Sequence, residues 1–136
     1  MEVVLHLPVV PNVELVAAKA VETLGSAIGM SQSHVEAASV ALVEACLNAM
    51  EHGGGSVVVR IAREPDEPRL RIEVEDHGRG FDPDASPPDT SSRVHGSVSK
   101  RGWGLRLIRE LMDDVQIHSQ PGRTLVCMWK NVETAS

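Results

Sequence analysis

Aromatic residues are scarce in this chain of 136 residues, which contains one Phe, two Trp and no Tyr. Its core must therefore be aliphatic, and hydrophobic residues, at 42% of the sequence, are sufficient for a globular core. An excess of cations is also missing, because 19 acidic and 13 basic residues give a net charge of −6. This charge argues against direct binding to nucleic acid, which requires a cationic face. It does not exclude a small anionic ligand, since backbone amides and a metal ion can neutralise phosphate locally.

Cysteines are few, and the two present, Cys46 and Cys127, have no metal-ligand spacing. Both fall within apolar segments, so we expect buried free thiols in a reducing compartment. No apolar run approaches the roughly 18 residues of a membrane-spanning helix. Residues 1–11 also lack the basic and apolar regions of a signal peptide. We therefore expect a single domain, residues 1–136, that is cytoplasmic and has no membrane contact.

Hydrophobic periodicity predicts an α+β fold with the order β-α-α-β-β-loop-α-β-β, in which helices cover one face of a sheet. Asn12 is the expected N-cap of the first helix, and Ser33 with Glu36 has the form of a capping box for the second. The expected strands are 2–10, 57–61, 70–74, 115–119 and 123–130, and the expected helices are 13–28, 34–52 and 105–112.

Residues 82–101 have no periodicity and are dense in Ser, Pro, Asp and Gly. A loop of this length inside a compact domain is usually functional or disordered.

Three polar clusters carry the candidate chemistry. The first lies in VEACLNAMEH, where Glu44, Asn48 and His52 are four residues apart and share one face of a helix. An Asn carbonyl oxygen is a suitable ligand for Mg²⁺, and a Glu carboxylate can accept a proton or position a nucleophile. Read alone, this pattern is more typical of a solvated helix face than of a binding site.

The second cluster is VEDHGRGFDP, in which Asp76 ends a strand and is followed by Gly78 and Gly80. A carboxylate only accepts hydrogen bonds, which suits the amino group of a purine, and the glycines permit close approach of the backbone. An ordinary turn at the end of a strand is an equally good interpretation of this motif alone.

The third cluster is KRGWGLRLIREL, where Gly102 and Gly104 lead directly into an amphipathic helix beside Lys100 and Arg101. The free amides at a helix N-terminus bind phosphate, and the two cations would strengthen that binding. A lone G-x-G is weak evidence, and the Walker A pattern is absent.

The order of these motifs resembles the N box and glycine boxes of the GHKL ATPase superfamily. The motifs are E-x3-N on a helix, D-x-G-x-G after a strand, a long loop, and G-x-G at the start of a helix. The anti-sigma-factor serine kinases are the most similar group, and GWGLRLIRELMDDVQIHS resembles their second glycine box and following helix. The resemblance spans residues 8–130. It implies a Bergerat-type two-layer sandwich, with helices on one face of a mixed, mainly antiparallel sheet, and residues 82–101 as the ATP lid.

The resemblance also implies residue roles. Glu44 would be the general base, Asn48 would bind Mg²⁺, and Asp76 would contact the adenine of ATP or ADP. The family has a Thr directly after a Gly near the last strand, whereas here Arg123 separates Gly122 from Thr124. The implied nucleotide-binding residues are Asn48, Asp76, Gly78, Gly80, Lys100, Arg101, Gly102, Gly104, the amide of Leu105, and Thr124.

The function implied by the resemblance is an ATP-dependent protein-serine kinase. It would phosphorylate an anti-anti-sigma (STAS-type) protein and sequester a sigma factor, so that partners switch upon phosphorylation. Homodimerisation is left open. The alternatives are a non-catalytic nucleotide-binding switch that holds a partner, a detached histidine-kinase catalytic domain, and a plain α+β domain without a ligand.

Overall fold

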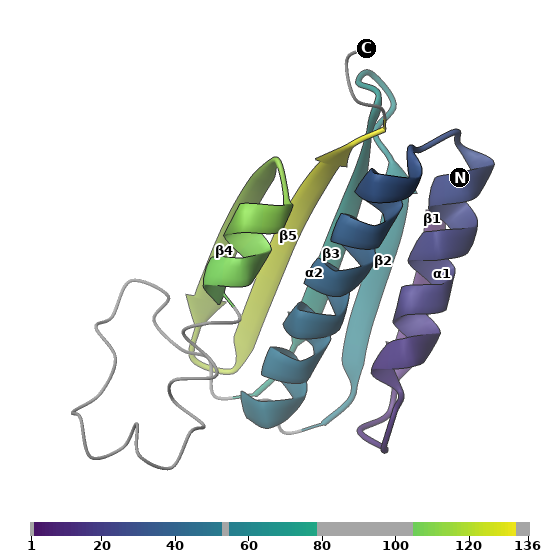
Figure 1. Cartoon of the computed structure of the whole chain (residues 1–136). Coiled ribbons are helices and arrows are strands. Elements are labelled where there is room, and N and C mark those ends of the chain that lie inside the picture. Colours follow the sequence, from purple (N-terminus) through teal and green to yellow (C-terminus); the bar gives the residue numbers. More distant parts are fainter. Residues whose placement is uncertain (1, 53–54, 79–104, 133–136) are drawn as a thin grey trace.

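Helices cover one face of a five-stranded antiparallel sheet in the computed structural model, which describes residues 2–52, 55–78 and 105–132 (Figure 1). We call the face covered by the helices the inner face and the opposite one the outer face. The strand order is β1-β2-β3-β5-β4. The elements are β1 (Glu2–Leu7), α1 (Glu14–Ala27), α2 (Gln32–His52), β2 (Val57–Arg63), β3 (Arg69–Asp76), β4 (Asp114–Gln120) and β5 (Arg123–Asn131), and residues 105–111 form a further helix before β4.

The β2–β3 hairpin shows how residue alternation positions the sheet. Val59 pairs with Val74 and Ile61 with Ile72, so these apolar side chains share the inner face and are fully buried. The next pair along the inner face is Val57 with Asp76. A carboxylate therefore ends a row of otherwise apolar residues, and this change in polarity marks one end of the covered face.

Small residues allow α2 to lie close to the sheet, where it packs on β3 and β5. Its buried positions include Ala38, Ala41, Ala45 and Ala49, together with Cys46. Burial, with the nearby charge of Glu14, raises the pKa of the Cys46 thiol to about 12. Both cysteines are buried and free, as expected from the sequence.

The fold class expected from the sequence is confirmed, although all four strand pairings are antiparallel and none is parallel among the described strands. The closing hairpin joins β4 to β5 through Pro121 and Gly122, and Gly122 has the positive φ of 86° that this tight turn requires. The expected lid at 82–101 lies outside the described residues.

The expected helix starts are wrong in two places. Asn12 is not the N-cap of α1, because it has a left-handed φ of 67° and Val13 takes that position without a side-chain cap. For α2 the capping residue is Ser31 rather than Ser33, since Ser31 Oγ accepts a hydrogen bond from the amide of His34 at 3.3 Å. The first strand is also shorter than expected and ends at Leu7 before Pro8.

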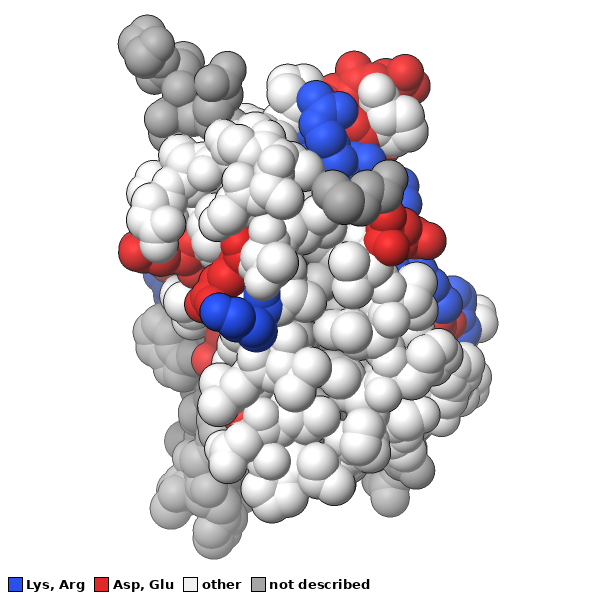
Figure 2. Space-filling view, turned by 90° about the vertical axis from the view of Figure 1, so that its right-hand side faces the viewer, with Lys and Arg blue, Asp and Glu red and all other residues white. Residues whose placement is uncertain are grey.

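Figure 2 shows the side of the molecule on which α1 lies, and few charged side chains appear over much of that side. No helix within the described ranges is long and apolar enough to span a membrane.

Candidate nucleotide site

Asp76 is the last residue of β3, and its side chain is 4% exposed at the end of the inner face. Its Oδ1 accepts a hydrogen bond from the amide of Gly78 at 3.0 Å, which turns the chain away from the sheet. Within the described part of the chain this is the only hydrogen bond of the carboxylate. A buried carboxylate with remaining acceptor capacity requires a donor, and a ligand can supply one.

Thr124 lies directly opposite Asp76 on β5 and is 2% exposed. Cross-strand partners of this kind place their Cβ atoms roughly 5 Å apart on the same face of the sheet. Ser119 on β4 is the next residue in this row, and its Oγ lies 3.1 Å from Oγ1 of Thr124. The pairing unites Asp76 and Thr124, although Arg123 separates Thr124 from the glycine before it. Ser119 was missed, because only the strand register reveals its position.

Asn48 faces the protein interior near the C-terminal end of α2 and is 6% exposed. Its Nδ2 is buried and has no hydrogen-bond partner among residues 2–52, 55–78 and 105–132. Glu44 lies one turn earlier and is partly buried, and it has no ion pair or side-chain hydrogen bond within the same ranges. A buried donor without a partner, such as Nδ2 of Asn48, is uncommon in protein interiors and points to a partner beyond the described residues.

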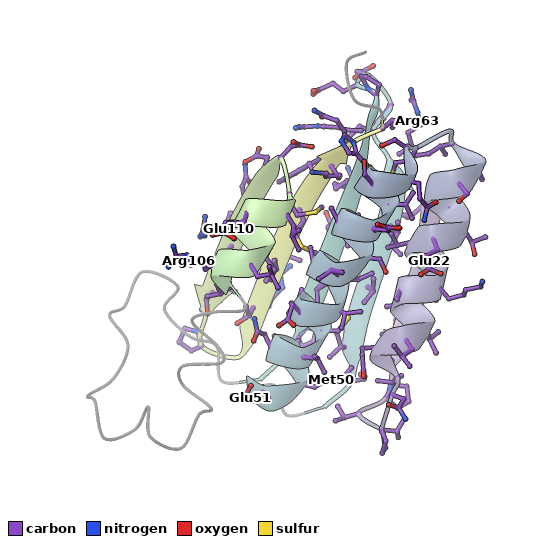
Figure 3. All side chains as sticks on the ribbon, viewed as in Figure 1. Glu22, Met50, Glu51, Arg63, Arg106 and Glu110 are labelled. Atoms are coloured by element: carbon purple, nitrogen blue, oxygen red, sulfur yellow. The ribbon has the colours of Figure 1, made fainter. Side chains whose placement is uncertain are left out.

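These groups gather at one end of the molecule. Figure 1 shows that the C-terminal end of α2, the end of β3, the start of β5 and the start of helix 105–111 all lie at that end. Met50 and Glu51 mark the end of α2 in Figure 3. The two motifs from distant parts of the sequence, E-x3-N and D-x-G, are therefore brought to the same end of the two-layer fold.

An ion-pair clamp on the outer face supports this end of the sheet. Glu75 precedes Asp76 and points to the opposite face, where it is bound by Arg123 of β5 and, at 3.0 Å, by Arg60 of β2. The hydrogen bond from Arg123, reinforced by Arg60, lowers the pKa of Glu75 although burial opposes the shift. The clamp joins three strands directly beneath the row that contains Asp76 and Thr124. The sequence alone does not reveal this ion pair, because it depends on the register of the strands.

Several expected site residues cannot be placed. Gly80, Lys100, Arg101, Gly102 and Gly104 lie outside the described residues. Leu105 is partly buried at the start of the described helix 105–111. The C-terminal end of this helix is fixed by Lys130, whose Nζ donates to the carbonyl of Leu111 at 2.6 Å.

The described groups fit a nucleotide. The buried carboxylate of Asp76, beside the hydroxyl groups of Thr124 and Ser119, can accept a hydrogen bond from an amino group. Helix α2 places the amide of Asn48 and the carboxylate of Glu44 at the same end of the fold. No group of three or more His, Cys, Asp or Glu residues gathers as a metal site within the described ranges. A Mg²⁺ ion bound with nucleotide needs few protein ligands, because phosphates and water complete its coordination.

A family model described as the histidine kinase-like ATPase domain matches residues 10–130. The chain belongs to this family. The serine-protein kinase RsbW of Bacillus velezensis is 31% identical over 130 residues, which cover 89% of this chain and 80% of the relative. RsbW of Bacillus subtilis is 32% identical over 111 residues, which cover 75% of this chain and 68% of the relative.

Solved structures share the fold. The RsbU and RsbW domains of Rv1364c from Mycobacterium tuberculosis give a TM-score of 0.72 at 20% identity, covering 97% of this chain and 32% of that one. A chain of the SiaB–SiaC complex of Pseudomonas aeruginosa gives a TM-score of 0.60 at 14% identity, and the match covers 94% of this chain and 88% of that chain. The matching family model describes an ATPase domain, so ATP is the nucleotide that the family implies.

Proposed function

We propose that this protein is an ATP-dependent protein-serine kinase that acts as an anti-sigma factor by partner switching. The observation that carries the proposal is the buried Asp76–Thr124 pair, which lies at the same end of the fold as the partnerless amide of Asn48. Membership of an ATPase family and similarity to RsbW serine-protein kinases support the choice of ATP and of serine.

The nucleotide would be held at both of its ends. Asp76 accepts the hydrogen bond of the adenine amino group, because its carboxylate has acceptor capacity left after binding the Gly78 amide. We assign Thr124, Gly78 and Gly80 to the same adenine site. For the phosphates we assign Gly102, Gly104 and the amide of Leu105, with Lys100 and Arg101 near the γ-phosphate.

Chemistry would depend on α2. The side-chain amide of Asn48 can bind Mg²⁺ through its oxygen, and Mg²⁺ when bound would neutralise the charge of the phosphates. Glu44 lies one turn away and accepts the proton of the attacking serine hydroxyl as general base. Its lack of an ion pair within the described ranges leaves the carboxylate free for this role.

The serine that accepts the phosphoryl group would belong to a STAS-type anti-anti-sigma protein. Phosphorylation would release that protein and allow the kinase to bind a sigma factor. The names of the RsbW relatives support the kinase role, and the structure of SiaB with SiaC is an example of this fold in complex with another protein.

A transfer assay tests the proposal. The protein is incubated with γ-labelled ATP, Mg²⁺ and a STAS-type protein of the same organism, and we expect label on one serine of the partner. Replacement of that serine by Ala is the control and should abolish labelling. Tight ATP binding without transfer to any such partner would contradict the kinase and favour the nucleotide-binding switch.

A further inference from the structure

A short row of polar side chains crosses three strands at the nucleotide end of the inner face. Asp76 of β3 lies opposite Thr124 of β5, and Thr124 lies opposite Ser119 of β4. The next row along the same three strands is apolar and consists of Val74, Val126 and Ile117. Ser119 is the outermost member of the polar row, because β4 is an edge strand of the sheet (Figure 1).

The two hydroxyl groups of this row are bound to each other. Oγ of Ser119 lies 3.1 Å from Oγ1 of Thr124, and either atom can be the donor. Thr124 is 2% exposed, and Ser119 is the only hydrogen-bond partner of its side chain within residues 2–52, 55–78 and 105–132. Asp76 lies across the strand pair but accepts no hydrogen bond from Thr124 there. The Thr124 hydroxyl is therefore held by β4 rather than by the carboxylate.

The direction of this hydrogen bond decides what Thr124 can offer a ligand. A hydroxyl group has one proton to donate and two lone pairs that accept. If Thr124 gives its proton to Ser119, it presents only lone pairs to a ligand beside the acceptor carboxylate of Asp76. If Ser119 is the donor, the Thr124 proton remains available, and the site then has an acceptor followed by a donor.

Adenine requires an acceptor followed by a donor. Its exocyclic amino group donates, and the adjacent ring nitrogen N1 accepts. Hypoxanthine and guanine present the reverse order, a carbonyl oxygen that accepts and an N1–H that donates. A donor at Thr124 therefore favours adenine over the other purines, since a mismatched base leaves buried polar groups of the site unpaired.

We propose that Ser119 is a positioning residue that makes the site selective for adenine. It donates its proton to Oγ1 of Thr124 and thereby directs the Thr124 proton to N1, without touching the base itself. When Ser119 is absent, the Thr124 hydroxyl turns to the carboxylate of Asp76 and occupies acceptor capacity that the amino group needs. The inference rests on the nucleotide site of the proposed function, but it does not depend on phosphoryl transfer.

Calorimetric titration of the full chain, with Mg²⁺, compares ATP with 1-deaza-ATP, in which a CH group replaces N1. The natural protein should bind 1-deaza-ATP roughly 2- to 10-fold more weakly than ATP, as expected for one lost neutral hydrogen bond. Ser119→Ala should bind ATP more weakly by a similar factor and should no longer distinguish the two nucleotides. Ser119→Thr keeps the hydroxyl and should restore the distinction.

Ser26→Ala is the matched control, because it makes the same change at an exposed position near the end of α1. It should leave both affinities at their natural values. If Ser119→Ala weakens ATP and 1-deaza-ATP equally, Ser119 only supports the structure and the proposal is wrong.

A double-mutant cycle shows whether Ser119 acts through Thr124. Thr124→Val keeps the shape of the side chain and removes its hydroxyl, so it should also abolish the distinction between the two nucleotides. Addition of Ser119→Ala to Thr124→Val should then lower ATP affinity no further. A further loss in the double variant overturns the proposal, because Ser119 would act independently of Thr124.

The same titrations separate this inference from the proposed kinase. ATP binding with the expected preference over 1-deaza-ATP, but without transfer to a partner, overturns the kinase and leaves the role of Ser119 intact. A natural protein that binds no ATP overturns the nucleotide site and the role of Ser119 together.

Discussion

The two faces of the sheet hold their polar residues in opposite ways. On the outer face, charged groups bind one another: Arg60 contacts Glu73 and Glu75, and Arg71 contacts Glu64 at 3.0 Å. On the inner face, Asp76 and Thr124 are buried polar residues that lie at one end of the sheet, and Asn48 of α2 is buried at the same end. Asp76 has a single hydrogen bond within the described chain, and Nδ2 of Asn48 has none there.

This difference separates groups that stabilise the fold from groups that bind a ligand. Charges satisfied by neighbours contribute to stability and have little capacity left for anything else. Buried groups without a partner lower stability, and a fold retains them where function requires them. We therefore expect inner-face changes to affect nucleotide chemistry, and outer-face changes to affect stability.

The largest effect is expected from Glu44→Gln. The amide cannot accept a proton from the attacking serine, so phosphoryl transfer should fall by about 10²–10⁴-fold, the usual contribution of a general base. Shape and polarity are kept, and ATP affinity should remain unchanged. Rates of transfer from labelled ATP and calorimetric titration measure the two quantities.

Glu36→Gln is the matched control for Glu44, because Glu36 is exposed near the start of the same helix. It should leave both transfer and affinity at the natural values. If Glu44→Gln transfers phosphate at the normal rate, α2 carries no general base at this position.

A smaller effect, on affinity alone, is expected from Asp76→Asn. The Asn side chain can still accept the hydrogen bond of the Gly78 amide, but its second group becomes a donor and faces the adenine amino group. Loss of one hydrogen bond to a charged group costs roughly 1.5–3 kcal/mol, so the dissociation constant for ATP should rise about 10- to 100-fold.

The control for Asp76 is Glu73→Gln on the outer face of the same strand. Glu73 binds Arg60 and Arg71 at 3.7 Å and 3.5 Å, so its neutralisation should alter stability slightly and ATP affinity not at all. Equal affinity losses in both variants would remove the distinction between the two faces.

Local patterns predicted the elements of the fold. Alternation at Val57, Val59 and Ile61 gave β2, and the register confirms their shared face. The predicted helix caps Asn12 and Ser33 were wrong, because several polar residues near each helix start can cap it and tertiary packing selects among them.

For the site, motif spacing predicted Glu44, Asn48 and Asp76, and strand pairing brings Thr124 to Asp76. Ser119 and the Glu75–Arg123 pair were missed, because they are separated in sequence and only the pairing of β3, β4 and β5 brings them into place. The roles of Glu44, Asn48, Asp76 and Thr124 at the site remain predictions.

The smallest effect is expected from Glu75→Gln, which tests the outer face. Its carboxylate is bound by Arg123 and Arg60, and both arginines are partly exposed, so solvent screening limits the loss of stability to about 1 kcal/mol at pH 7. Glu67→Gln in the β2–β3 loop is the control, because Glu67 is largely exposed and should change stability by less than about 0.5 kcal/mol.

The difference in unfolding free energy between the natural protein and Glu75→Gln should depend on pH. Arg123 and Arg60 hold the pKa of Glu75 below its usual value of 4.5 in the folded state, so the folded protein binds this proton less readily than the unfolded chain. The stabilisation is therefore complete above about pH 5 and is lost as the pH falls through the folded pKa. Urea unfolding at pH 7 and at pH 3 measures it, and other carboxylates cancel in the comparison. A stability difference as large at pH 3 as at pH 7 would show that Glu75 acts by shape rather than charge, and ATP affinity should be equal in both proteins at neutral pH.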